Sequence, residues 1–190
     1  MNLVIFGPPG AGKGTQSGYI AKKFKLFQLS TGELLRNEIK NNTNLGKQIS
    51  SIINSGNLVS NELVSNLIEK YLSDKTYQNK IIFDGYPRNL IQAQTLNDSL
   101  IKYNQKIHIA LRLTVSLDTI IKRIKERSAL EKRDDDSEEI AIKRYETYEK
   151  NIKPVIDFYN QSNLLKVVDG ESSIIEINNE ISALIESIKG

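Results

Sequence analysis

Apolar residues along this chain occur in two alternating patterns, short continuous runs and longer stretches with helical spacing. The short runs predict buried strands, and the stretches with apolar residues three and four positions apart predict helices. The predicted strands are 3–6, 27–30, 81–84, 107–113 and 164–168. The predicted helices are 13–24, two short helices within 31–54 that separate near Thr43, 61–72, 88–101, 117–127, a long helix after residue 137 that is broken or bent near Pro154, and 174–188. Because strands alternate with helices, the pattern predicts an α/β protein whose parallel sheet is covered on both faces.

The first apolar run ends in a glycine-rich segment, Gly7-Pro8-Pro9-Gly10-Ala11-Gly12-Lys13-Gly14-Thr15. Glycines let the backbone curl with positive φ and present successive N–H groups to an anion, and the N-terminus of the following helix adds partial positive charge. Lys13 supplies an ammonium for outer phosphates, and Thr15 supplies a hydroxyl within reach of Mg²⁺. The general motif has Ser or Thr directly after the lysine, whereas here Gly14 intervenes. A plain glycine-rich turn is the alternative, but the position directly after a strand favours a phosphate-binding loop.

The composition of the chain excludes several classes of site and partner. A chain of 190 residues is long enough for one well-buried α/β body. The absence of Cys excludes disulfides and thiolate metal sites, and the single His108 leaves carboxylates and water for a divalent ion, which favours Mg²⁺. The net charge of +3, with acidic and basic residues interspersed, predicts no nucleic-acid partner. No apolar stretch reaches the ~20 residues of a membrane span, and the first residues form no signal sequence, so we expect a cytoplasmic protein.

Arginine is the scarcer basic residue, because most of the 26 basic residues are lysine. The guanidinium group binds phosphate in a bidentate manner that a lysine ammonium reproduces poorly. Each arginine is therefore a candidate phosphate ligand. The seven arginines are Arg36, Arg88, Arg112, Arg123, Arg127, Arg133 and Arg144.

Three further segments, in this order, resemble the motifs of the adenylate kinase family. They are Leu29-Ser30-Thr31-Gly32-Glu33-Leu34-Leu35-Arg36, Phe83-Asp84-Gly85-Tyr86-Pro87-Arg88, and Arg133 with Asp135-Asp136 and Arg144. The resemblance runs from the glycine-rich loop to Val168-Asp169-Gly170 and points to the short-lid type of these nucleoside monophosphate kinases. It implies a P-loop NTPase fold with a five-stranded parallel sheet, and a monomer. It also implies a core of residues 1–29, 60–125 and 137–190, a nucleoside-monophosphate-binding insertion at 30–59, and a lid at 126–136.

The resemblance further implies Mg²⁺-dependent phosphoryl transfer, ATP + AMP = 2 ADP, without a covalent intermediate. The catalytic residues of the family correspond to Lys13, Arg88, Arg123, Arg133 and Arg144. Its ATP-binding residues correspond to Gly10, Ala11, Gly12, Lys13, Gly14, Thr15, Arg123, Arg127 and Ser172. Its AMP-binding residues correspond to Thr31, Arg36, Asn57, Leu58, Val59, Gly85, Tyr86, Pro87, Arg88, Gln92, Arg133 and Arg144. Mg²⁺ would be held through phosphates and waters near Thr15 and Asp84, and the cysteine-free lid would bind no zinc.

Several residues allow two interpretations. Asp84 closes an apolar strand, where it could hold Mg²⁺ through water or cap the helix that begins near Arg88; we favour the first. Arg112 is expected to be an outward-facing or salt-bridged strand residue, and His108 a structural one. Asp135 and Asp136 resemble lid aspartates, whereas the role of Asp134 is unassigned.

The nature of the substrates depends on few positions. Thr31 and Gln92 resemble the adenine-selecting residues of adenylate kinases, where pyrimidine monophosphate kinases usually carry Ala and Asn, so a UMP/CMP kinase is the alternative. The base of the donor nucleotide would be contacted by the backbone near Ser172. Backbone contacts do not reveal from the sequence whether the donor is ATP or GTP. A non-catalytic P-loop regulator is an alternative of another class. A GTPase-like switch would need Asn-Lys-x-Asp, but Asn79-Lys80-Ile81-Ile82 lacks the aspartate.

Overall fold

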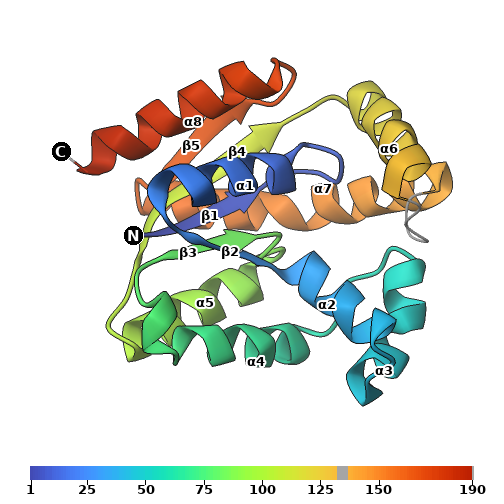
Figure 1. Cartoon of the computed structure of the whole chain (residues 1–190), viewed down its shortest axis with the longest axis horizontal. Helices are drawn as coiled ribbons and strands as arrows, with labels where there is room; N and C mark the ends of the chain where they lie inside the picture. Colours follow the sequence, from blue (N-terminus) through green and yellow to red (C-terminus); the bar gives the residue numbers. More distant parts are fainter. Residues whose placement is uncertain (132–136, 190) are drawn as a thin grey trace.

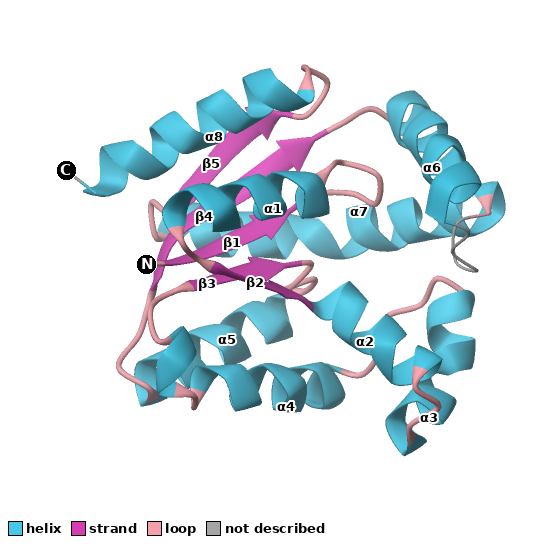
Figure 2. Ribbon diagram, viewed as in Figure 1, coloured by secondary structure: helices cyan, strands magenta, loops and turns pink. Residues whose placement is uncertain are grey.

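A single parallel sheet forms the centre of the molecule. The computed structural model describes residues 1–131 and 137–189. The sheet has five strands in the order β2-β3-β1-β4-β5, so the strand that leads into the glycine-rich loop lies in the middle (Figure 2). The strand bounds are β1 Asn2–Phe6, β2 Phe27–Ser30, β3 Ile81–Asp84, β4 Ile107–Thr114 and β5 Leu165–Asp169. All paired strands are parallel, which confirms the predicted α/β class.

Helices cover both faces of the sheet and extend past its carboxyl edge. Helices α1 and α8 cover one face, and α4, α5 and α7 cover the other. Helix α6 lies on one side of the carboxyl ends of the strands, and α2 with α3 lies on the opposite side (Figure 1). The bounds are α1 Lys13–Phe24, α2 Thr31–Lys40, α3 Asn44–Asn54, α4 Asn61–Leu72, η1 Lys75–Tyr77, α5 Leu90–Lys102, α6 Leu117–Glu131, α7 Glu138–Gln161 and α8 Ile174–Lys189. Among the described helices, none is long and apolar enough to cross a membrane.

The predicted end of one helix is wrong, and another helix lacks the break that was expected as one alternative. Helix α6 continues to Glu131 instead of ending at residue 127. Helix α7 is continuous through Pro154, although proline removes one backbone hydrogen bond from a helix interior. Ile152 and Val155 on either side of Pro154 are 3% and 0% exposed. Their burial against the sheet holds the helix together where local propensity alone favours a break.

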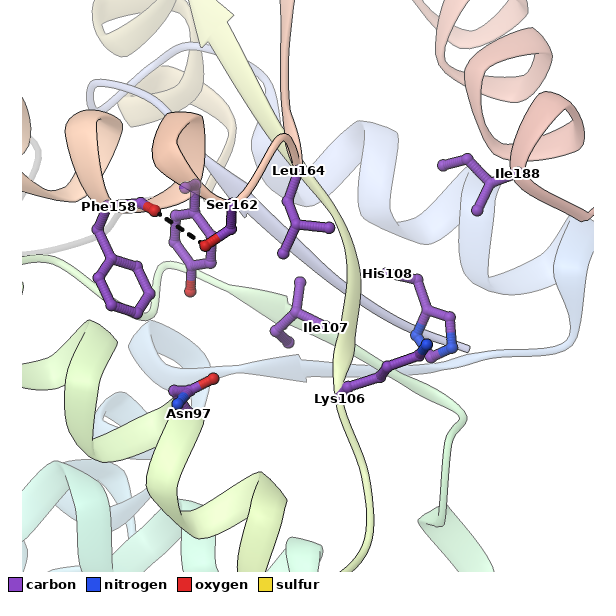
Figure 3. A pocket seen from close by; sticks show the side chains of 9 residues that line it. Asn97, Lys106, Ile107, His108, Phe158, Ser162, Leu164 and Ile188 are labelled. Atoms are coloured by element: carbon purple, nitrogen blue, oxygen red, sulfur yellow. Dashed lines mark hydrogen bonds between the residues drawn. The ribbon is translucent and has the colours of Figure 1, made fainter.

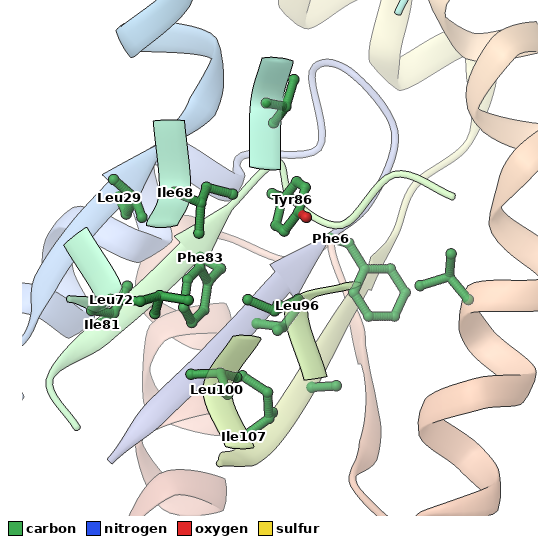
Figure 4. Packing of buried hydrophobic residues seen from close by; sticks show 14 of the residues in the cluster. Phe6, Leu29, Ile68, Leu72, Ile81, Phe83, Tyr86, Leu96, Leu100 and Ile107 are labelled. Atoms are coloured by element: carbon green, nitrogen blue, oxygen red, sulfur yellow. The ribbon is translucent and has the colours of Figure 1, made fainter. Parts of the chain in front are cut away.

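Alternation along each strand divides the core into two layers. In β1, Val4 and Phe6 pack against α4, α5 and α7, whereas Leu3 and Ile5 pack against α1 and α8. Figure 4 shows the first layer, in which aromatic and aliphatic side chains from β1, β3, α4 and α5 meet. The ring of Phe6 stacks on that of Tyr159 at 6.1 Å between centroids. Because β1 and β3 are buried on both faces, the centre of the sheet is a rigid support whose carboxyl edge is free to carry polar groups.

His108 occupies the opposite, amino end of β4. Its Nδ1 accepts a hydrogen bond from the backbone N–H of Asn2 at 3.1 Å, which ties β4 to the first residues of β1. Burial lowers the pKa of His108, and the nearby N-terminal ammonium and Lys106 lower it further. The folded state therefore favours neutral imidazole.

We expect this histidine to make the protein sensitive to acid. Its folded pKa lies below the unfolded value of about 6.5, so the unfolded state binds the proton more readily, and stability is lost as the pH falls through that window. Because His108 is the only histidine, its pKa can be read directly from its imidazole proton resonance. Urea unfolding at pH 7.5 and 5.5 should show a smaller loss of stability for His108→Asn than for the wild type. An equal loss, or a resonance titrating above pH 6.5, would contradict this account.

Candidate functional site

A hollow of about 800 Å³ lies at the carboxyl edge of the sheet. Its walls come from the glycine-rich loop, α2, the turn after α3, the end of β3, α6 and α7. The carboxyl ends of parallel strands meet at this edge, so loops that are far apart in sequence converge here. This position is where open α/β sheets bind their ligands.

Helix α1 begins at this hollow without a side-chain cap. Its N-cap is Gly12, with φ of 86°, and no side chain accepts from its first amides. The N-termini of the other seven α-helices in the described part of the chain are capped by side chains, those of Ser30, Thr43, Ser60, Asn89, Ser116, Ser137 and Ser173. The amides at the start of α1, together with the positive end of the helix dipole, are therefore available to an external anion.

Lys13 lies folded over the glycine-rich loop. Its Nζ donates to the carbonyl oxygens of Gly7 and Pro8, each at 2.8 Å. Burial lowers the pKa of Lys13 to about 8; Asp84 opposes this shift, and three arginines, Arg88, Arg144 and Arg127, add to it. The site thus concentrates positive charge around one ammonium, a field that favours a multiply charged anion.

Asp84 provides the opposite charge beside Lys13. Its carboxylate accepts from Gln28 Nε2 at 3.0 Å, and a Cβ on Gly14 would lie 3.7 Å from its Oδ2, so the acid lies against the start of α1. Burial raises the pKa of Asp84, and Lys13 opposes the shift. Asp84 does not cap α5, because Asn89 Oδ1 accepts the backbone N–H of Gln92 at 2.9 Å. The helix-cap interpretation of Asp84 is therefore wrong.

Gly85 organises the opposite wall. Its carbonyl accepts from Arg88 Nε at 2.7 Å and from Thr31 Oγ1 at 3.0 Å. Its φ is +74°, and a Cβ there would lie 3.2 Å from Arg88 Nη2 and 3.3 Å from Thr31 Oγ1. Gly85 is therefore required for both contacts. Arg36 enters the same wall over Gly32, where a Cβ would lie 3.3 Å from Arg36 Nη1.

Gln92 lines this wall in a fixed orientation. Its Oε1 accepts from the backbone N–H of Arg88 at 2.8 Å, and its Nε2 donates to Asn61 Oδ1 at 3.0 Å. Asn89 Nδ2 donates to the same Asn61 oxygen at 2.9 Å. Since a backbone N–H can only donate, the orientation of the Gln92 amide is determined. One N–H and one lone pair of Gln92 remain for a ligand.

The wall formed by α6 and α7 carries the other cations. Arg123 Nη2 donates to the carbonyl of Gly170 at 2.8 Å, and Arg127 also lines the hollow. A Cβ on Gly56 would lie 3.2 Å from Arg144 Cγ, so Arg144 on α7 lies beside the turn after α3. Cationic side chains therefore face the hollow from both sides of the glycine-rich loop.

Most predicted site residues lie together around this hollow. The predicted residues that line it are Gly10, Ala11, Gly12, Lys13, Gly14, Thr15, Thr31, Arg36, Asn57, Leu58, Val59, Asp84, Gly85, Pro87, Arg88, Gln92, Arg123, Arg127 and Arg144.

Two predicted residues do not line this hollow, and a third is not described. The side chain of Tyr86 is 1% exposed, packs in the core and shares a hydrogen bond with Ser65 Oγ at 3.1 Å. Ser172 lies in the exposed turn before α8. Arg133 lies outside the described residues, as do Asp134, Asp135 and Asp136.

Arg112 differs from its expected placement. It belongs to an interior strand covered on both faces, and its guanidinium lies near Tyr148 of α7. Its Nε is buried without a hydrogen-bond partner, and the described residues contain no ion pair to it. Burial raises the pKa of Tyr148 to about 12, although Arg112 opposes that shift. Arg112 thus lies against α7 instead of facing outward, and it forms no salt bridge with any described residue.

Sequence reasoning missed several residues of the site. They are Gln28 beside Asp84, Asn61 beside Gln92, Tyr148 on α7, and Ile174 at the start of α8. Only Gln28 carried a usable signal, because it is a polar residue in a short strand directly before the Ser30-Thr31 segment.

A second hollow, of about 480 Å³, lies at the amino end of β4 (Figure 3). It is lined by Asn97, Lys106, Ile107, His108, Phe158, Tyr159, Ser162, Leu164 and Ile188. None of the predicted site residues is among them. The candidate site is therefore the larger hollow alone.

Comparison with known proteins agrees with this geometry. The family model described as "Adenylate kinase" matches residues 5–164. An adenylate kinase of Pelagibacter ubique is 42% identical to this chain, and the alignment covers 98% of this chain and 100% of that protein. An adenylate kinase of Maricaulis maris is 39% identical, and the alignment covers 98% of this chain and 99% of that protein. The first alignment spans 212 positions, more than the 190 residues here, so a part of that relative has no counterpart in this chain. With the uncapped helix, the lysine and the surrounding arginines in place, the chain belongs to the adenylate kinase family.

Proposed function

We propose that the chain catalyses reversible transfer of the γ-phosphoryl group of ATP to AMP, giving two ADP. The observation that carries the proposal is the single hollow in which the start of α1 and Lys13 lie between arginines of opposite walls. Arg36 and Arg88 are on one side, and Arg123, Arg127 and Arg144 are on the other. Two phosphate chains meeting end to end would be contacted from both walls. Phosphoryl transfer requires this alignment and charge stabilisation more than it requires any covalent group.

The donor nucleotide would bind at the glycine-rich loop. The amides from Gly10 to Thr15 and the Lys13 ammonium would hold its phosphates, and Arg123 and Arg127 would contact them from α6. The backbone near Ser172 would lie against the donor base. Lys13 would exchange its two carbonyl acceptors for phosphate oxygens, which restores the charge balance that burial disturbs.

The acceptor nucleotide would bind between the insertion 30–59 and the end of β3. Arg36, Arg88 and Arg144 would hold its phosphate, with Arg133 as the further contact that the family resemblance suggests. Its base would lie near Thr31, Leu58 and Val59, with Asn57 at the edge, and the free N–H and lone pair of Gln92 match the donor and acceptor on adenine. Gly85, Pro87 and the backbone of Tyr86 would shape the floor. The Tyr86 side chain is buried in the core and therefore does not reach the nucleotide.

The residues present fit Mg²⁺ bound through phosphates and water. Asp84 is a buried carboxylate against the first turn of α1, and Thr15 lines the same hollow. Hard oxygen ligands and a largely hydrated ion are what Mg²⁺ prefers. Mg²⁺ supplies additional positive charge to the transferring phosphates when it is bound. Asp84 and Thr15 would hold its water shell, and Gln28 would fix the carboxylate.

The protein's own part in the reaction is alignment, charge stabilisation and the exclusion of water. Lys13, Arg88, Arg123, Arg133 and Arg144 would surround the equatorial oxygens of the transferred group. Water competes with AMP as acceptor, so the insertion 30–59 and a short zinc-free lid at 126–136 would have to cover the hollow during transfer. The remaining segments, 1–29, 60–125 and 137–190, would form the supporting core. We further propose that the protein is a cytoplasmic monomer, as the resemblance to adenylate kinases implies.

The direct test is ADP formation from ATP and AMP. In a coupled assay with Mg²⁺, we expect efficient turnover with AMP and much slower turnover with UMP or CMP. Efficient turnover of UMP or CMP with negligible activity toward AMP would favour a pyrimidine monophosphate kinase. Nucleotide binding without any transfer would favour a non-catalytic regulator.

Gln92→Asn tests acceptor recognition. The shorter amide cannot reach both Arg88 and the base, so the KM for AMP should rise about tenfold, the effect of roughly one lost hydrogen bond to a substrate, while the KM for ATP stays within about twofold. The matched control is Gln94→Asn, because Gln94 lies on the same helix and is exposed. Parallel increases in both KM values, or an unchanged KM for AMP, would exclude the role proposed for Gln92.

Lys13→Met tests the charge argument. It removes a desolvated ammonium together with its two hydrogen bonds, so the melting temperature without nucleotide should change by less than about 3 °C, whereas turnover should fall ~10²-fold or more. Stabilisation by added ATP should also shrink, since it depends on affinity. Lys22→Met, on the exposed face of the same helix, is the control. Retained turnover, or an unfolded variant, would count against this assignment.

A further inference from the structure

Glu171 connects the loops that follow the two neighbouring strands β4 and β5. Its carboxylate accepts the backbone N–H of Ser116 at 2.6 Å through Oε1 and the hydroxyl of Thr119 at 2.7 Å through Oε2. Ser116 and Thr119 lie at the start of α6, and Glu171 lies in the turn between β5 and α8. The hydrogen bond from the Ser116 backbone, with those from Thr119 and Ser116 hydroxyls, lowers the pKa of Glu171. The carboxylate is therefore an ionised acceptor at neutral pH, which strengthens both bonds.

The same turn is fixed by three further hydrogen bonds. Gly170 N–H donates to the carbonyl of Thr114 at 2.9 Å, Glu171 N–H donates to Asp169 Oδ1 at 3.0 Å, and Arg123 Nη2 donates to the Gly170 carbonyl at 2.8 Å. A Cβ on Gly170 would lie 2.6 Å from Val115 Cγ2, so the two loops are in close contact. We call residues 169–171 with 114–119 the β4–β5 clamp. The clamp joins the turn before α8 to the helix that carries Arg123.

The clamp also connects to the glycine-rich loop. Gln16, in the first turns of α1, donates through Nε2 to the carbonyl of Ile174 at 3.0 Å, just after the clamp. The segment after β5, which comprises the turn and the first residue of α8, is thus bonded to α1 on one side and to α6 on the other. These two helices carry Lys13 and Arg123, the cations proposed for the donor phosphates. A shift of the turn would change their relative position.

We propose that Glu171 is a positioning residue for the donor nucleotide. Its carboxylate holds the start of α6 against the turn, so that Arg123 and the backbone near Ser172 stay aligned with the loop that binds the donor phosphates. Glu171 is not among the residues that line the hollow. The inference rests on the proposed function for the location of the donor nucleotide. It assigns a role to a residue that is otherwise an ordinary exposed carboxylate.

A simple helix cap is the competing explanation. Glu171 accepts from the first turn of α6, and removing such a cap lowers stability whatever the ligand. The two roles differ in what they change. A cap affects folding and both nucleotides alike, whereas a positioning residue affects the donor nucleotide selectively.

The experiment compares Glu171→Ala, Glu171→Gln and the control Glu176→Ala. Glu176 is also an exposed carboxylate that accepts a backbone N–H, from Ser173 at 2.9 Å, but it shows no bond to α6. For Glu171→Ala we expect the KM for ATP and the dissociation constant of ATP measured by calorimetry to rise about fivefold to tenfold, the scale of one to two lost hydrogen bonds, with the KM for AMP within about twofold. Glu171→Gln should restore most of the affinity, because the amide oxygen still accepts from Ser116 and the amide N–H can donate to Thr119 Oγ1. Glu176→Ala should leave both values unchanged.

A second readout follows the clamp itself. The Ser116 amide proton should shift upfield in the NMR spectrum of Glu171→Ala and stay near its original position in Glu171→Gln. Unchanged ATP affinity in Glu171→Ala, equal increases for ATP and AMP, or the same effect in Glu176→Ala would overturn the inference. A wild-type chain that binds ATP but forms no ADP would refute the proposed function alone, because the calorimetric comparison still decides the role of Glu171.

Discussion

Burial disfavours the charged form of Lys13. The neighbouring cations Arg88, Arg144 and Arg127 disfavour it further. Asp84 is the carboxylate that offsets this field most, and it is itself buried and held by Gln28. Such an arrangement costs stability in the absence of a ligand, because like charges are kept together in a partly desolvated space. A polyphosphate relieves the repulsion, so the binding free energy includes the removal of this unfavourable term. The positions of the loops, the uncapped helix and the two cationic walls can all be understood as ways of holding these charges together.

Backbone geometry makes this concentration possible. The sheet places β1 in the centre, so the loop that follows it is flanked by the ends of β3 and β4. A Cβ on Gly7 would lie 2.7 Å from the Leu113 carbonyl, which shows how closely the loop passes over β4. Gly85 plays the corresponding part on the β3 side, where its positive φ turns the chain so that its carbonyl holds both Thr31 and Arg88. Lys13 and Arg88 therefore lie close behind the ends of β1 and β3, whereas the other arginines of the site are carried by α2, α6 and α7.

The sequence predicts those features of the structure that depend on residues close together along the chain, and it fails for contacts between distant residues. The strands, most helices and the glycine-rich loop follow from local patterns, because continuous apolar runs and helical spacing report burial directly. Pro154 shows the limit of that reasoning, since tertiary burial of Ile152 and Val155 overrides the local signal. Tyr86 lies next to predicted site residues in sequence, yet its side chain turns into the core toward Ser65. The contacts of Gln28 with Asp84, of Asn61 with Gln92 and of Arg112 with Tyr148 join residues 31 to 56 positions apart, and no local pattern encodes them.

The arginines of the site lie on separate helices, so the binding of nucleotides and the approach of the two walls are coupled through charge. Arg36 belongs to α2, Arg123 and Arg127 to α6, and Arg144 to α7, so any movement that brings the two walls together also brings like charges together. Without phosphate, that approach is opposed by Coulomb repulsion in a space of low dielectric constant. One nucleotide would neutralise part of the charge and two nucleotides would neutralise both walls, so a closed arrangement would be most stable with donor and acceptor both bound. The same electrostatics that favours binding thus also discourages closure over a donor and water alone, which is the condition for transferring the phosphoryl group to AMP in preference to hydrolysing ATP.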